Sequence, residues 1–296
     1  MELALRDRLR TPGVWSFTDA MPVSEAAEFA ARVEAFGYSA LWVPDTVGRD
    51  PFAHIAHLAS QTTSLVFATG IASIFQRHPG AMKQAAYTLA EQTGDRFVLG
   101  LGVSHAPMVV GVRRLDYSKP LSQMSAYLEA MAASPYRSPE SVSITPPPTV
   151  LAALGPKMLA LSAAAADGAH PYWTTPEHTA EARNLLGPDK LLCVEQKVVL
   201  STDSAAAREA ANTALAMYAK LPNYRNNWIR LGYRDEEIEH RDHRFVDAVV
   251  AWGDEEAVRS RIRAHYDAGA DHVCIQVLPT AGSGTDWHAL EVLAQR

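Results

Sequence analysis

The chain has 296 residues, of which 48% are hydrophobic and 20% are charged, as is usual for a globular enzyme. Its formal net charge of −6 argues against a nucleic-acid or anionic membrane partner, because such partners select basic surfaces. No apolar run is long enough to cross a bilayer, and residues 1–10 lack the apolar stretch of a secretory signal, so we expect a cytoplasmic protein that acts on a small molecule.

In the first half of the chain, short β-rich runs alternate with amphipathic helices. Ser24 is expected to cap the first helix and Gly37 to end it, and Pro51 is expected to begin the second. The pattern predicts strands over 13–17, 40–44, 65–71 and 96–102, and helices over 24–36, 52–61 and 80–91.

The second half repeats this alternation. Pro120, Pro156, Thr175 and Asp254 are helix-start signals, because proline is favoured in the first turn and Thr or Asp at the cap. A long helical region is expected from 204 to about 250, and a closing helix over 286–294. Strands are predicted over 149–153, 169–173, 191–200 and 272–278.

Eight strands alternating with helices predict an α/β fold of the (β/α)₈ TIM-barrel type, with short loop insertions and one domain over 1–296. Several strands are apolar on both faces, as buried parallel strands are. An open doubly wound sheet is the alternative, but no Gly-x-Gly-x-x-Gly motif follows the first strand. The sequence therefore favours the barrel.

The active sites of such barrels lie at the carboxyl ends of the strands, which selects candidate residues by position alone. These candidates are Phe17, Thr18, Asp45, Thr46, 69–73, 103–105, 153–157, Thr174, Thr175, Gln196 and 276–279.

The turn over 152–158 is the most informative of these segments. A strand ends there, the chain turns at Gly155, and Pro156 occupies the first helical position. Free backbone N–H groups at a helix start form an anion site, and Lys157 adds positive charge. The two interpretations are a phosphate site and an ordinary β-to-α turn.

Two titratable residues follow predicted strands. Asp45 either handles protons in a partly dry pocket or caps a turn before Thr46. His105 either donates a proton or hydrogen bond to a cofactor or is a loop residue without a role.

No metal site is expected. His54 and His57 lie three residues apart on one helix face, but no third ligand is spaced with them. Cys193 and Cys274 lie in separate apolar segments, which predicts buried thiols and no disulfide.

Four segments in order resemble the luciferase-like monooxygenase superfamily, and in particular its coenzyme F420-dependent branch. Each segment is common alone, and the likeness lies in their order and spacing over nearly the whole chain. The segments are 37–44 (Gly-Tyr-Ser-Ala-Leu-Trp-Val-Pro), 68–71 (Ala-Thr-Gly-Ile), 94–102 (Gly-Asp-Arg-Phe-Val-Leu-Gly-Leu-Gly) and 154–158 (Leu-Gly-Pro-Lys-Met), with 166–168 (Ala-Asp-Gly) one helix later.

The resemblance implies that the ring of coenzyme F420 lies at the strand ends of a (β/α)₈ barrel. Thr69, Gly70 and Ile71 match the family's bulge, in which a non-prolyl cis peptide bond backs the ring. Val103 and Ser104 match, together with His105, the loop that touches the ring. The turn that holds the coenzyme phosphate corresponds to Ala153, Leu154, Gly155, Pro156, Lys157 and Met158.

The implied activity is an F420-dependent oxidoreductase that transfers a hydride between the deazaflavin and an unidentified small organic substrate. Asp45 or His105 would exchange the accompanying proton. The substrate would lie among Trp15, Phe17 and Trp173, and the family resemblance implies a homodimer.

Two departures and two alternatives remain. Residues 44–46 (Pro-Asp-Thr) replace the strand-two histidine of some sugar-phosphate dehydrogenases of the branch, and 108–118 do not match the luciferases proper. The alternatives are an FMN-dependent oxygenase of a two-component flavin system and a non-catalytic flavin- or deazaflavin-binding protein.

Overall fold

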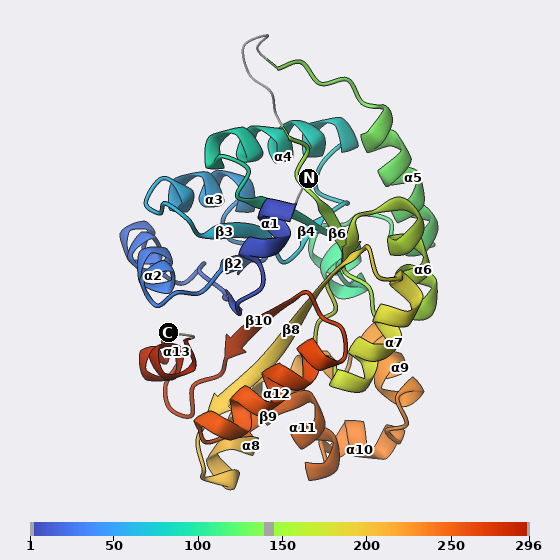
Figure 1. Ribbon diagram of the computed structural model, residues 1–296. Coiled ribbons are helices and arrows are strands. Elements are labelled where there is room, and N and C mark those ends of the chain that lie inside the picture. The colour runs from blue at the N-terminus through green and yellow to red at the C-terminus, as the bar shows by residue number, and fades with distance from the viewer. Residues whose placement is uncertain (1–2, 139–144, 295–296) are drawn as a thin grey trace.

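A computed structural model describes residues 3–138 and 145–294. Eight parallel strands form a ring that closes where the last strand pairs with both the seventh and the first, so the predicted TIM barrel is confirmed (Figure 1). The ring strands are β1 (Gly13–Trp15), β2 (Ala40–Val43), β3 (Val66–Thr69), β5 (Phe97–Gly102), β6 (Thr149–Leu151), β7 (Gly168–Ala169), β8 (Leu191–Leu200) and β10 (His272–Val277).

Helices surround this ring, and most of their starts follow the predicted cap signals. Asp50, Thr175 and Asp254 cap their helices through side-chain oxygens, but Ser24 does not cap, because the first outer helix already begins at Val23. The helices of the outer layer are α2 (Val23–Ala35), α3 (Pro51–Ala59), α4 (Pro79–Thr93), α5 (Pro120–Ala133), α6 (Pro156–Ala165), α7 (Pro176–Leu186), α12 (Glu255–Asp267) and α13 (Trp287–Leu293).

The long helical region expected over 204–250 is present, but it is divided into several helices. It forms α8 (Ser204–Tyr218), α9 (Pro222–Arg230), α10 (Asp235–His240) and α11 (His243–Val249), and then the strand β9 (Val250–Gly253), which pairs with the end of β8. Proline in the first turn of α9 and left-handed backbone at Gly232 and Arg241 separate the helices.

Two further strand predictions need correction. Ladder pairing of β7 ends at Ala169, and 170–173 run on without strand structure to Trp173, which has a φ of 58°. A short strand, β4 (Ala72–Ser73), lies beyond the end of β3 and pairs with β5. Both changes lie at the carboxyl ends of strands, where the chain leaves the ring.

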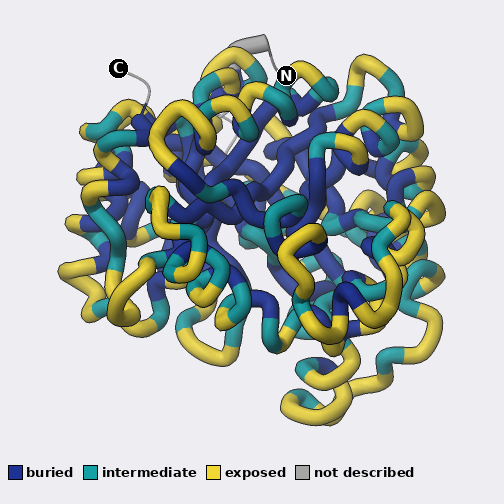
Figure 2. Tube along the Cα trace, turned by 90° about the horizontal axis from the view of Figure 1, so that it is seen from below, coloured by how far each residue is buried: buried dark blue, intermediate teal, exposed yellow. Residues whose placement is uncertain are grey.

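Side chains fill the barrel interior. Trp15, Trp42, Cys193 and Cys274 belong to one buried cluster, which α1 (Leu3–Arg8) closes from the amino-terminal end with Leu5. Both cysteines are buried and free, as predicted. A larger apolar layer lies between the strands and the outer helices, so that buried residues occupy the centre of the molecule and exposed residues its edge (Figure 2).

A third apolar cluster joins α8–α11 to the end of β8. It includes Trp173, Trp228 and Phe245, all fully buried. Because β8 extends beyond its neighbours, these helices lie against one side of the barrel mouth, where they contribute aromatic side chains. No helix among the described residues is both long and apolar enough to span a bilayer.

Candidate active site

A backbone bulge follows β3 at the barrel mouth. The Gly70–Ile71 peptide bond is cis, which confirms the prediction of a non-prolyl cis bond at this position. The Thr69 hydroxyl donates to the Gly100 carbonyl (2.7 Å) and accepts from the Gly100 amide (2.9 Å), which ties the bulge to β5. The Trp15 indole N–H donates to the Gly70 carbonyl at 3.1 Å, so β1 also holds the bulge.

The strand ends around this bulge have no room for side chains. A Cβ at Gly70 would lie 2.4 Å from Trp15 Nε1, and one at Gly100 would lie 1.9 Å from the Thr69 carbonyl oxygen. A Cβ at Gly102 would lie 2.5 Å from Ile71 Cδ1. The protein's own atoms fill these spaces, so glycine at the three positions lets the bulge pack closely against Trp15 and β5. This packing fixes the bulge at the place where the sequence resemblance implies the deazaflavin ring.

Asp45 lies directly beside the bulge. Its amide donates to the Ile71 carbonyl at 3.3 Å, and its Oδ2 accepts from the Ser73 amide at 3.1 Å. Burial raises the pKa of Asp45, although hydrogen bonds and the charge of Arg113 oppose that shift. The structure therefore brings Asp45 together with 69–71, as the sequence predicts.

The loop after β5 reaches the same mouth. The Tyr117 hydroxyl donates to the Ser104 carbonyl at 3.1 Å, and the His105 ring lies 5.4 Å from that of Tyr224. Burial lowers the pKa of His105, against the effect of a hydrogen bond with Asn223, so its imidazole is neutral near pH 7. Its buried Nδ1 has no hydrogen-bond partner in the described part of the chain.

The turn over 153–158 is open above its glycine. Gly155 precedes α6 with no side-chain cap, and a Cβ there would have no atom within 4 Å. The Leu154 carbonyl accepts from His178 Nε2 (2.8 Å) and Arg230 Nη2 (3.2 Å). Lys157 is exposed and lines a hollow of about 450 Å³ between α5 and α6. Pro156 has no N–H and the Met158 amide donates to the Gly155 carbonyl at 3.1 Å, so this helix start offers a phosphate the Lys157 amide and the charges of Lys157 and Arg230.

The sequence analysis did not identify a buried ion pair on the inner face of β8. Lys197 Nζ lies 2.7 Å from Glu195 Oε1, and the two side chains are 1% and 0% exposed. Glu195 Oε2 also accepts from the Trp173 amide at 3.2 Å. The available signal is two opposite charges two residues apart in an otherwise apolar strand, which places both on one face.

Four aromatic residues surround this pair and are called here the mouth cluster: Tyr172, Trp173, Tyr218 and Tyr224. Lys197 Nζ lies 3.6 Å from the ring centroid of Tyr172 and 4.1 Å from that of Trp173. The Tyr172 hydroxyl donates to Gln276 Oε1 at 2.9 Å, and its ring lies 5.2 Å from that of Trp15. Trp15 thus connects the mouth cluster to the bulge.

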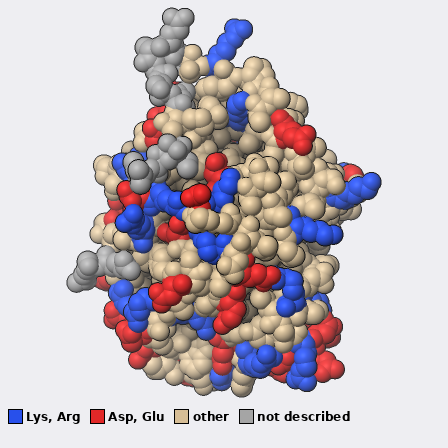
Figure 3. Space-filling view, turned by 45° about the vertical axis from the view of Figure 1, so that its right-hand side comes forward, with Lys and Arg blue, Asp and Glu red and all other residues tan. Residues whose placement is uncertain are grey.

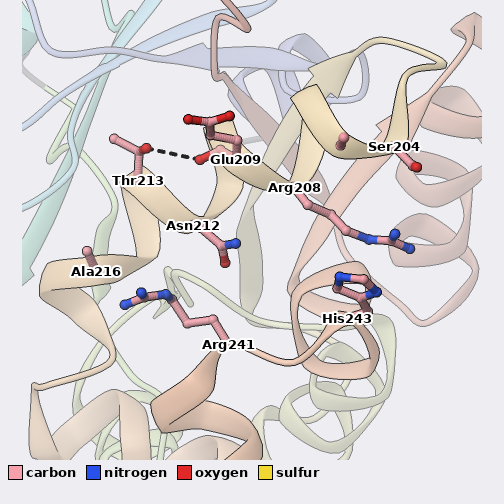
Figure 4. Close-up of a pocket in the computed structure, with 9 residues that line it drawn as sticks. Ser204, Arg208, Glu209, Asn212, Thr213, Ala216, Arg241 and His243 are labelled. Carbon is pink, nitrogen blue, oxygen red and sulfur yellow. Dashed lines mark hydrogen bonds between the residues drawn. The ribbon is translucent and has the colours of Figure 1, made fainter.

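Elsewhere in residues 3–138 and 145–294, no comparable site is found. A hollow of about 580 Å³ lies outside α8, where Arg241 and His243 face Asn212 (Figure 4), but it contains no residue from a strand end. His54 is paired with the Thr18 hydroxyl at 2.9 Å. Among the described residues, no group of three or more His, Cys, Asp or Glu is arranged to hold a metal ion.

Comparisons with known proteins agree on family and fold. The family described as luciferase-like monooxygenase matches residues 9–272. A Mycobacterium tuberculosis relative, provisionally named a coenzyme F420-dependent oxidoreductase, is 27% identical over 342 aligned residues that cover 95% of this chain and 96% of the relative.

Two solved structures share the fold. The coenzyme F420-dependent tetrahydromethanopterin reductase from Methanopyrus kandleri superposes with a TM-score of 0.75 at 16% identity, covering 96% of this chain and 97% of that one. The FMN-bound oxygenating constituent of 3,6-diketocamphane monooxygenase from Pseudomonas putida has a TM-score of 0.69 at 12% identity, with 97% of both chains covered.

Proposed function

The chain belongs to the luciferase-like monooxygenase family, and from this premise we propose that it is an F420-dependent oxidoreductase. It transfers a hydride between the deazaflavin and a small organic substrate. The observation that carries the proposal is the backbone bulge at Gly70 and Ile71, which lies against the part-buried Asp45, together with the open helix start at Gly155. The F420-dependent name of the mycobacterial relative, which matches nearly the full length, supports the choice of coenzyme.

Each part of the mouth has a role in holding the coenzyme. Thr69, Gly70 and Ile71 would support the ring of the coenzyme, together with the loop of Val103 and Ser104. The residues proposed to hold the phosphate are Ala153, Leu154, Gly155, Pro156, Lys157 and Met158, through the Lys157 amide at the helix start and the Lys157 charge.

The bound deazaflavin supplies two-electron chemistry, and the chain positions it and moves protons. Asp45 and His105 are proposed as proton-handling residues, because both are part-buried at the mouth and have pKa values shifted toward their neutral forms. Of the three aromatic residues predicted at the substrate site, Phe17 is 48% exposed and would contact the substrate, whereas Trp15 and Trp173 are buried and support the site from beneath.

A coenzyme turnover assay tests this proposal. The full chain is mixed with reduced F420 and a panel of ketones, aldehydes and enones, and the return of the coenzyme absorbance is followed. We expect substrate-dependent reoxidation without oxygen. Oxygen-dependent product formation with reduced FMN, and none with F420, would instead assign the chain to the two-component oxygenases. Binding without turnover by any substrate class would favour a non-catalytic role.

A further inference from the structure

We propose that Tyr172 gives and takes the proton at the reacting oxygen, and that the buried Glu195–Lys197 pair beneath its ring positions and polarises it. This inference rests on the proposed function and narrows its substrate to an uncharged aldehyde or ketone and the corresponding alcohol.

Tyr172, Glu195 and Lys197 are called here the proton unit, and Tyr172 is the residue of this unit that a substrate can reach. Lys197 is 1% exposed, and its neighbours Glu195 and Trp173 are fully buried, whereas Tyr172 is part-exposed at the mouth. The indole of Trp15 lies next to Tyr172 and also donates to the Gly70 carbonyl. A substrate stacked between the bulge and the mouth cluster would therefore contact Tyr172, and the hydroxyl, which donates to Gln276 Oε1 in this structure, would turn to the substrate oxygen.

The Lys197 ammonium is placed to stabilise a Tyr172 phenolate. It lies 3.6 Å from the ring centroid, where a cation is attracted by the π face, and the attraction grows when the ring becomes an anion. Glu195 holds the ammonium at 2.7 Å and is itself held by the Trp173 amide. Burial lowers the pKa of Lys197 to about 8, against the effect of Glu195, so the ammonium form prevails at pH 7.

Tyr172 keeps its proton until the substrate oxygen becomes negative. Burial raises the pKa of Tyr172 well above its usual value, and the neighbouring tyrosines and Glu195 act in the same direction. The titratable groups around this unit are Glu195, His170, Cys274, Tyr218 and Tyr224.

In the direction of reduction, the carbonyl carbon gains a hydride (two electrons and a proton) from the reduced deazaflavin, and the deazaflavin is thereby oxidised. The carbon–oxygen π bond breaks, its electron pair moves to the oxygen, and the oxygen takes the Tyr172 proton to form the alcohol. The phenolate regains a proton from water through the Tyr218 hydroxyl, 3.3 Å away. Alcohol oxidation runs the same transfers in reverse.

The charges of the unit define the substrate class. Because Glu195 already neutralises Lys197, this end of the mouth has no surplus positive charge to bind a phosphorylated or carboxylated substrate. Phe17 and Tyr172 both pack on Trp15 and are the aromatic rings that a substrate can reach, which suits apolar substituents on the carbonyl. Cyclohexanone and benzaldehyde are therefore suitable probes, and glyceraldehyde 3-phosphate is the charged counter-probe.

The test compares Tyr172→Phe with Tyr233→Phe, which removes a hydroxyl from a ring that packs on Phe245 away from the mouth. With reduced F420 and cyclohexanone or benzaldehyde, we expect Tyr172→Phe to lower kcat roughly 100-fold while its F420 affinity stays within about twofold. Tyr233→Phe should keep the wild-type rate. Unchanged kcat in Tyr172→Phe, or preference for glyceraldehyde 3-phosphate, would overturn the inference.

The role of Lys197 is tested by a pH profile and by a readout without coenzyme. Lys197→Met should move the alkaline limb of kcat to higher pH, because a phenolate without the ammonium forms less readily, and Lys197→Arg should restore it in part. In the coenzyme-free protein, the ¹³Cζ NMR signal of Tyr172 should shift in Lys197→Met and stay in place in Tyr233→Phe. A signal and a profile unaffected by Lys197→Met would contradict the positioning role.

F420 binding is measured first on the wild-type chain. No F420 binding would refute the proposed function, whereas binding and turnover with no effect of Tyr172→Phe would refute this inference alone.

Discussion

At the scale of single residues, some groups at the barrel mouth could be predicted from the sequence and others could not. Gly70 and Ile71 could be identified because a short segment resembles a known bulge, and the cis bond is present. Tyr172 could not, because nothing in the sequence distinguishes a tyrosine over a lysine from one in an ordinary core. Glu195 and Lys197 could be found only from the two-residue side-chain period of β8, which places both on one strand face. Two charges are rarely buried on one face unless they pair with each other.

His105 provides the first prediction. Its neutral imidazole has a buried, unpartnered Nδ1 and lies against Tyr224, which fits a hydrogen bond to a ligand. We expect His105→Ala to slow hydride transfer about tenfold to 100-fold and to weaken F420 binding less than that. Single-turnover kinetics separate the two effects. An unchanged transfer rate would remove His105 from the proposed proton-handling residues.

At the scale of elements, the alternation of strand and helix determined which segments enter the ring, and all eight predicted strands do so. Over 204–250 the pattern predicted a helical region but not its division into four helices, because helical periodicity continues across breaks made by single residues such as Gly232 and Arg241. It also missed β9, which packs against α11 and α12 and depends on the extra length of β8. Contacts of that kind are long-range and leave no local signal.

The turn between α4 and β5 gives a stability prediction. Arg96 is only 8% exposed, and its guanidinium donates to the carbonyls of Leu65 (2.6 Å), Thr93 (2.8 Å) and Ala59 (3.4 Å). Replacing it by methionine removes the guanidinium donors from these carbonyls, of which that of Ala59 keeps only the long bonds from Thr62 (3.4 Å), so we expect Arg96→Met to lower the free energy of unfolding by about 2–4 kcal/mol.

Urea unfolding followed by circular dichroism measures this change. Arg263→Met is the matched control, since Arg263 pairs with Glu256 on the exposed face of α12 and should cost less than about 1 kcal/mol. Equal effects of the two variants would show that Arg96 does not stabilise the turn.

At the scale of the whole molecule, the charge pattern and the buried histidines matter most. Positive and negative side chains are interspersed on the face shown in Figure 3, in keeping with a small-molecule enzyme. We also propose that residues 1–296 form a single barrel domain.

Inside the barrel domain, burial lowers the pKa of His170 and His265 to about 3 and that of His272 to about 4. All three are therefore neutral in the folded protein at pH 5–7.

These histidines predict a loss of stability in mild acid. The unfolded chain takes up protons below about pH 6.5, whereas the folded chain does not until about pH 3–4, so unfolding is favoured as the pH falls through that window. Between pH 7.5 and 5.5 we expect each histidine to cost about 1.4 kcal/mol. The raised pKa values of Asp45 and Glu195 act in the opposite direction.

Urea unfolding at pH 7.5, 6.5 and 5.5 checks this dependence. His265 bonds to Gln196 Oε1 and to the Thr179 hydroxyl. The His265→Gln variant lacks one of the three histidines, so its free energy of unfolding should depend less steeply on pH than that of the wild-type chain. Identical slopes for the two proteins would rule out His265 as a source of the effect.

Equilibrium binding of oxidised F420 and of FMN to the same purified chain tests the central claim most directly. Fluorescence titration should give an F420 dissociation constant at least about tenfold below that for FMN, a difference of about 1.4 kcal/mol. Tight FMN binding with no detectable F420 binding would contradict the account.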